Sequence, residues 1–189
     1  DAHEGRPKVE VAQRFINSIN PNIIVEPIAT QWQDATANLE DCDIVLGAVD
    51  SYADREALER FCRRNLIPYI DIGMDVIELG DGKYHITGQV IQSLPGGPCM
   101  RCSTFITDEK LTLEAEKYGG AGSRPQVIWP NGVLASTAVG FAISLLCPWQ
   151  TQSALFRYVA YDGDTGTLSA PSFLQHLDGQ QCTHHPIAE

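Results

Sequence analysis

The chain has 189 residues, of which 43% are hydrophobic and 20% are charged, so it can bury a sizeable core in one globular domain. Its 24 Asp and Glu against 13 Lys and Arg give a formal net charge of -11, which repels phosphate backbones and excludes nucleic acid as the expected main partner. The six cysteines lack the spacing of a secreted disulfide framework and favour a reducing, cytoplasmic setting.

The first residues have neither the basic start nor the apolar core of a signal peptide. The longest apolar run, residues 133–147, is shorter than a membrane span and is interrupted by hydroxyl residues. We therefore expect a soluble protein without a targeting segment.

The first half of the chain alternates between the spacing of helices and the composition of strands. The predicted elements are a helix over 7–19, a strand over 22–28, a strand over 43–49, a helix over 52–65 and a strand over 68–73. The run 43–49 is almost continuously apolar, as in a parallel strand that is covered on both faces. Strand, helix and strand at these lengths form a βαβ unit and predict a parallel sheet.

The second half predicts antiparallel structure and two more helices. Its elements are a hairpin of 74–79 and 83–93, a helix over 108–118, a loop over 119–125, a helix over 131–146 and a late hairpin of 155–162 and 166–169. Gly80-Asp81-Gly82 predicts the turn of the first hairpin, and Asn131 is a candidate N-cap for the long helix. The small residues of that helix suit close packing, in the core or in a dimer. The predicted fold is a Rossmann-like α/β domain with an added antiparallel hairpin.

Two ligand pairs with the same spacing stand far apart in the chain. Cys99 and Cys102 follow a Gly/Pro-rich segment, and Cys182 is followed three residues later by His185. Zinc accepts mixed thiolate and imidazole ligands at this spacing, so these four residues are a candidate Cys3His structural zinc knuckle, with His184 as the reserve ligand. The alternatives are four unconnected residues or a disulfide within the Cys-x-x-Cys pair.

Asp50 lies at the carboxyl end of the best predicted parallel strand, where ligands of open α/β sheets bind. A carboxylate there could hold Mg²⁺ against a nucleotide phosphate, or Asp50 or Ser51 could simply cap the next helix. Arg55 could contact the phosphate, although a solvated pair with Asp54 or Glu59 is the commoner arrangement.

Two further features have the composition of phosphate-binding elements. Lys8 stands at the start of a helix, where an anionic ligand would offset the unfavourable dipole, although an exposed lysine explains it equally well. The glycine-rich residues 119–123 follow a helical pattern instead of a strand, so we interpret them as a crossover loop and not as a nucleotide loop.

Four pieces together resemble the ThiF/MoeB/HesA family, bacterial relatives of the ubiquitin-activating enzymes. They are Gly5-Arg6-Pro7-Lys8 with Asn20-Pro21, the strand end Asp50-Ser51 with Arg55, the segment from Gly88-Gln89-Val90 to Gly97-Pro98-Cys99-Met100-Arg101-Cys102, and Cys182-x-x-His185.

This resemblance implies ATP- and Mg²⁺-dependent adenylation of a carboxylate, usually the C-terminal glycine of a ubiquitin-like or sulfur-carrier protein. Lys8 would contact the ATP phosphates, and Asp50 would bind Mg²⁺ near the α-phosphate, beside Ser51 where many members carry Asn. Family members are commonly homodimers, and peptides are a further expected class of partner.

Three departures qualify the resemblance. The family's first strand, nucleotide loop and ribose-binding acid would precede Asp1, so residues 1–189 are expected to be the C-terminal portion of an adenylating domain, inactive alone. No cysteine lies between Cys102 and Cys147, which favours adenylation without a covalent cysteine step, and His185 replaces a usual cysteine ligand. The alternative is a zinc-stabilised, non-catalytic binding module of the same fold.

Overall fold

The computed structural model describes residues 5–117, 127–149, 154–177 and 180–185. The chain divides into two compact units, residues 1–41 and 42–189. The predicted loop over 119–125 lies outside the described residues.

The first unit contains helix α1 (Lys8–Ile19), a 3-10 helix (Trp32–Ala35) and the short helix α2 (Thr36–Leu39). The predicted first helix is confirmed. The predicted strand over 22–28 is wrong: the segment is irregular, and the side chain of Ile24 is 97% exposed. β-branched composition favours a strand only where a neighbouring strand offers hydrogen-bond partners, and no described strand pairs with this segment.

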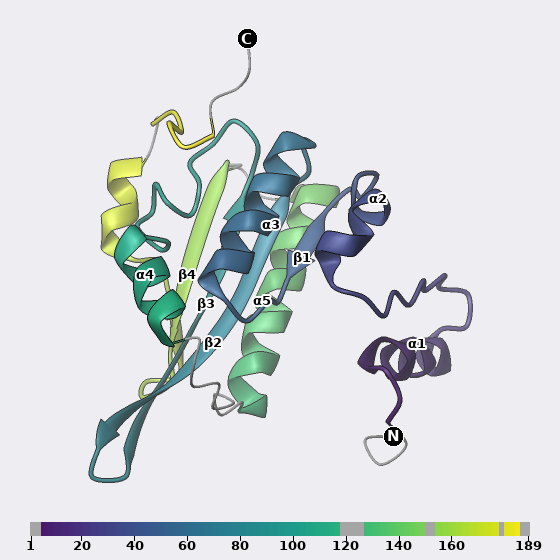
Figure 1. Cartoon of the computed structure of the whole chain (residues 1–189), viewed down its shortest axis with the longest axis horizontal. Coiled ribbons are helices and arrows are strands. Elements are labelled where there is room, and N and C mark those ends of the chain that lie inside the picture. The colour runs from purple at the N-terminus through teal and green to yellow at the C-terminus, as the bar shows by residue number, and fades with distance from the viewer. Residues whose placement is uncertain (1–4, 118–126, 150–153, 178–179, 186–189) are drawn as a thin grey trace. The chain divides into compact units, whose positions relative to one another are not determined.

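The second unit is built on a five-stranded sheet in the order β1-β2-β3-β4-β5 (Figure 1). The strands are β1 (Val45–Gly47), β2 (Tyr69–Gly80), β3 (Lys83–Ser93), β4 (Phe156–Asp162) and β5 (Thr167–Ser169). Only β1 and β2 pair in parallel; the other neighbours are antiparallel. The prediction of a mainly parallel sheet is therefore corrected to a mixed α/β sheet.

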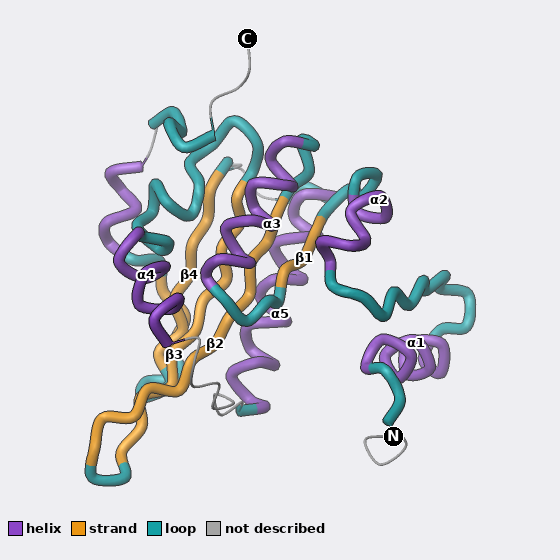
Figure 2. Tube along the Cα trace, in the orientation of Figure 1, coloured by secondary structure: helices purple, strands orange, loops and turns teal. Residues whose placement is uncertain are grey.

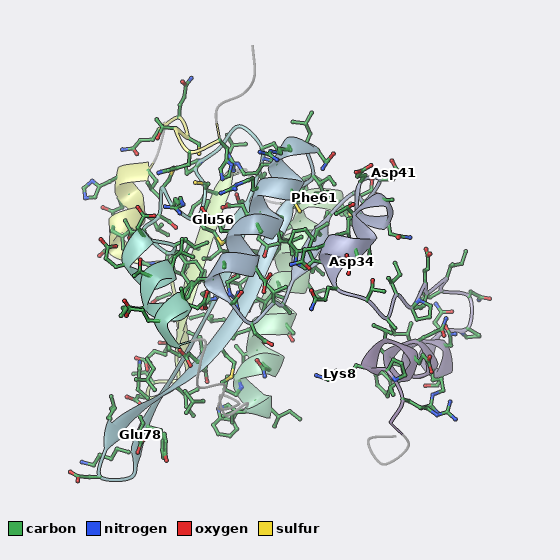
Figure 3. The ribbon with its side chains drawn as sticks, viewed as in Figure 1. Lys8, Asp34, Asp41, Glu56, Phe61 and Glu78 are labelled. Carbon is green, nitrogen blue, oxygen red and sulfur yellow. The ribbon has the colours of Figure 1, made fainter. Side chains whose placement is uncertain are left out.

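The predicted hairpin is confirmed, but it is not a separate addition. β2 runs without a break from Tyr69 to Gly80, so the buried strand and the first hairpin arm are one long strand that projects with β3 beyond the sheet (Figure 2). All three turn residues have positive φ, which glycine adopts freely at positions 80 and 82. Glu78 lies toward the far end of this hairpin (Figure 3).

Helices cover both faces of the sheet. Helix α3 (Tyr52–Arg64) lies on one face and α5 (Ile128–Leu146) on the other (Figure 1). The core between α5 and the sheet consists of buried residues from both: Ile70, Val90, Leu134, Ala138 and Tyr161. Gly88 permits this packing, since a Cβ there would stand 2.5 Å from Cδ1 of Leu134.

Helix α5 begins three residues before the predicted start. Its N-cap is Val127, which corrects the assignment of Asn131 to that position. Pro130 is tolerated because first-turn residues have no intrahelical N–H bond to lose.

Helix α5 has 19 residues and is longer than the apolar run 133–147, which the sequence analysis considered too short for a membrane span. The length of α5 and its mean hydropathy of 1.3 would allow it to cross a membrane. Leu134 and Ala138 are buried against the sheet, but only 28% of the apolar window of α5 is buried, so the helix packs on the domain along one face.

The remaining described elements are α4 (Asp108–Lys117) and a 3-10 helix (Ser172–Leu177). The predicted helix over 108–118 and the late hairpin are confirmed within the described residues.

Candidate functional site

The loop between β1 and α3 presents Asp50 at the end of the parallel strand pair. Asp50 is exposed, and its carboxylate makes no hydrogen bond or ion pair with the residues that the structure describes. Ser51 is the N-cap of α3: its Oγ accepts from the backbone N–H of Asp54 at 2.9 Å and donates to Asp54 Oδ2 at 2.7 Å. Because Ser51 caps the helix, the Asp50 carboxylate stays available at the rim of the sheet.

Arg55 is buried on the next turn of α3 and not solvated as a surface pair would be. Its Nη1 donates to Asp71 Oδ2 at 2.5 Å and to the Ile72 carbonyl at 3.1 Å. Tyr69 and Gln89 also donate to the Asp71 carboxylate. Burial raises the pKa of Asp71, an effect that the adjacent Arg55 guanidinium opposes. The expected partners Asp54 and Glu59 are thus replaced by Asp71, a residue that the sequence analysis missed.

Lys8 is the first residue of α1 and is exposed (Figure 3). Pro7 precedes it as the N-cap and supplies no side-chain hydrogen bond. The contact of Lys8 with ATP phosphates stays a prediction.

The knuckle thiols and the C-terminal ligands come together within the second unit. Potential ligand atoms of Cys99, Cys102, Cys182 and His184 all lie within 4.8 Å of one another. The two thiol sulfurs of the Cys-x-x-Cys pair are 3.6 Å apart, and His184 Nδ1 is 3.5 Å from Cys99 Sγ and 3.4 Å from Cys102 Sγ. The histidine in this group is therefore His184, the reserve ligand, in place of His185.

This donor set fits zinc. Two thiolates at Zn–S distances near 2.3 Å in a tetrahedron would lie about 3.8 Å apart, close to the observed sulfur separation. All six cysteines belong to the described residues and all are free, so the alternative of a disulfide within the pair is not what the structure contains.

His185 belongs to a second, more buried group with Glu59 and Cys99. Glu59 accepts from the backbone N–H of Met100 at 3.0 and 3.3 Å, which ties α3 to the knuckle. Burial raises the pKa of Glu59 to about 7. Burial, and then the charge of Arg63, lower the pKa of His185 to about 4. The Nε2 of His185 is buried without a hydrogen-bond partner among the described residues, and it lies 3.9 Å from Glu59 Oε2.

A second contact also joins α3 to the knuckle. Arg101 Nε donates to Glu56, which projects from α3 (Figure 3), and Arg101 Nη1 donates to Asp108 Oδ1 at 2.7 Å. Sequence reasoning missed Glu56 and Asp71, and it named Glu59 only as a possible partner of Arg55. Only Asp71 carried a signal: it is an acid inside a predicted buried strand, and a buried charge requires a partner.

The protein-family model described as ThiF family matches residues 1–183 of the chain. The chain is 30% identical over 104 residues to the SAMP-activating enzyme E1 of Haloferax volcanii, covering 54% of this chain and 35% of that protein. It is 29% identical over 169 residues to the molybdopterin-synthase adenylyltransferase of Escherichia coli, covering 87% of this chain and 61% of that enzyme. The chain thus spans about a third to three fifths of these relatives' length.

Solved structures with a similar fold include E. coli MccB with ATP, at a TM-score of 0.61 and 20% identity, covering 88% of this chain and 48% of that chain. The microcin C7 biosynthetic enzyme MccB in complex with N-formylated MccA gives a TM-score of 0.63 at 18% identity, covering 88% and 49%. At these identities the likeness concerns the fold.

Proposed function

Because the chain belongs to the ThiF family, we propose that it is part of an ATP-dependent adenylyltransferase that activates the C-terminal carboxylate of a ubiquitin-like, sulfur-carrier or peptide substrate. The observation that carries the proposal is the exposed carboxylate of Asp50, which follows a parallel strand and precedes the N-terminus of α3. The names of the relatives, an adenylyltransferase and an E1, support the reaction class.

In this reaction an oxygen of the substrate carboxylate attacks the α-phosphorus of ATP, and pyrophosphate leaves. Asp50 would hold Mg²⁺ through its free oxygens, and the metal would neutralise charge that gathers at the phosphate. Lys8 would supply a second positive charge to the phosphates. Arg55 would contribute indirectly by fixing α3 to β2, since its guanidinium donates to the Asp71 carboxylate.

We further propose that zinc is held by Cys99, Cys102, Cys182 and one of the two histidines, His184 by its position in the cluster. Zinc would supply no reaction step: it would tie the knuckle to the C-terminal segment, while Glu59 and Glu56 join the knuckle to α3. A cytoplasmic location and a homodimer complete the proposal by analogy with the family.

Pyrophosphate exchange into ATP, measured on the complete protein with candidate carboxylates, tests the function. Asp50→Ala should lower carboxylate-dependent exchange on the order of a hundredfold or more. Asp43→Ala is a matched control, because Asp43 is also exposed but lies before β1. Absence of exchange with every candidate carboxylate would instead support a zinc-stabilised binding module. Unchanged exchange in Asp50→Ala would remove Asp50 from the site.

A further inference from the structure

A side chain of helix α4 accepts hydrogen bonds from the backbone of the first turn of α3. Glu114 Oε1 accepts from the backbone N–H of Tyr52 at 2.9 Å, and Glu114 Oε2 accepts from the N–H of Ala53 at 3.1 Å. These N–H groups have no intrahelical acceptor, and a carboxylate is favoured at the positive end of the helix dipole. One side chain of α4 therefore holds the backbone two and three residues after Asp50.

A second residue of α4, one turn earlier, holds the side chain of Tyr52. Lys110 Nζ lies 5.3 Å from the centroid of the Tyr52 ring and 5.2 Å from that of Phe105, and it donates to the Phe105 carbonyl at 2.7 Å. The two rings themselves lie 5.6 Å apart. Tyr52 is thus fixed by its backbone through Glu114 and by its ring through Lys110 and Phe105.

These contacts are not part of a closed apolar interface between the two helices. A groove of about 520 Å³ separates them, lined by Ala53, Glu56, Ala57, Arg60, Leu111, Glu114 and Ala115. Because this groove separates the two helices along part of their length, the contacts of Glu114 and Lys110 with residues 52 and 53 tie α4 to the start of α3.

We propose that Glu114 is a positioning residue for Asp50, an inference that rests on the proposed role of Asp50 in binding Mg²⁺. The Asp50 carboxylate is exposed and makes no hydrogen bond or ion pair with the described residues, so its position depends on the backbone of residues 50–53 that carries it. Ser51 anchors that backbone from inside α3, and Glu114 anchors it from α4. Loss of the Glu114 carboxylate frees the first turn of α3 and displaces the metal-binding oxygen atoms.

The test is calorimetric titration of the complete protein with ATP, once with Mg²⁺ and once with a chelator. Glu114→Ala should weaken Mg²⁺-dependent ATP binding about tenfold or more, as loss of an outer-shell partner does, and should leave metal-free ATP binding unchanged. Glu114→Gln retains one acceptor oxygen and should lie between Glu114→Ala and the unsubstituted protein. Glu116→Ala, an exposed acid on the same helix, should bind as the unsubstituted protein does.

A merely structural Glu114 would lower the melting temperature without changing the Mg²⁺ dependence of ATP binding in the folded protein, and that result would overturn the inference. Asp50→Ala separates this failure from failure of the proposed function. If Asp50→Ala loses the Mg²⁺ dependence and Glu114→Ala keeps it, only the positioning role is wrong. If Asp50→Ala also keeps it, the assignment of Asp50 fails first.

Discussion

His184 and His185 are adjacent in the chain, yet they lie in different groups of potential ligands. His184 Nδ1 stands within 3.5 Å of two thiol sulfurs, whereas His185 Nε2 is 3.9 Å from a carboxylate oxygen of Glu59. The chain bends over residues 183–185, and the two side chains reach different neighbours: one histidine lies among the thiols and the next beside Glu59. The spacing of the motif predicts His185 as the fourth zinc ligand, whereas the structure places His184 beside the thiols.

The two histidines should therefore differ in their importance for zinc binding. His184→Ala should lower zinc affinity roughly tenfold or more and alter the visible spectrum of the Co²⁺-substituted protein, because a nitrogen ligand is lost from the metal. His185→Ala should keep its zinc and its Co²⁺ spectrum. Metal analysis after dialysis, together with absorption spectroscopy, measures both. The opposite pattern, with His185 required and His184 dispensable, would restore the assignment made from the motif.

Helix α3 connects the proposed phosphate end of the domain to the metal knuckle. At its C-terminal end, Arg63 Nη1 donates to Ser93 Oγ at 2.9 Å and to the carbonyls of Leu94 at 3.0 Å and Pro98 at 3.2 Å. Its Nη2 donates to the Gly97 carbonyl at 2.6 Å. A buried guanidinium thus organises the segment that leads to Cys99.

Removing the guanidinium of Arg63 should destabilise the domain. Arg63→Ala leaves several buried acceptors without a donor and should lower the free energy of unfolding by about 3 kcal/mol or more. Arg64→Ala is the matched control: Arg64 is exposed, and its loss should change that free energy by less than about 0.5 kcal/mol. Urea unfolding measures both variants. Equal effects of the two substitutions would show that Arg63 does not hold this segment.

At the scale of the whole molecule, the cysteine–histidine cluster joins segments that are about 80 positions apart in the sequence. Cys99 and Cys102 follow β3, whereas Cys182 and His184 follow the last 3-10 helix. A bound ion would close this long loop and stabilise the folded state, since the unfolded chain offers no preformed site.

Removal of the metal should therefore destabilise the second unit. A strong zinc chelator is expected to lower the melting temperature by roughly 5 °C or more, and zinc should restore it where calcium does not, because calcium does not favour thiolate ligands. Circular dichroism during heating measures the change. A melting temperature that is indifferent to chelation, with metal analysis near zero, would leave the cluster as free thiols and imidazole.

The local elements follow from the sequence wherever nearby residues suffice to determine them. Helix α1 has apolar spacing and a proline stop, the hairpin turn has Gly80 and Gly82, and Ser51 has a helix start to cap. These features depend on the backbone preferences of a few consecutive residues. Residues 22–28 show the limit of such reasoning, because strand formation there needed a distant partner.

The sequence alone predicts the family, the order of most helices and strands, an aspartate that follows a strand, and two ligand pairs of matching spacing. The folded chain is needed to see that most of the sheet is antiparallel, that Arg55 pairs with Asp71, that His184 lies in the cysteine cluster, and that Glu114 reaches the start of α3. The physical reason is distance along the chain. Helix spacing and turns depend on residues a few positions apart, whereas pairing, burial and ligation depend on residues 16 to 85 positions apart that only the folded chain brings together.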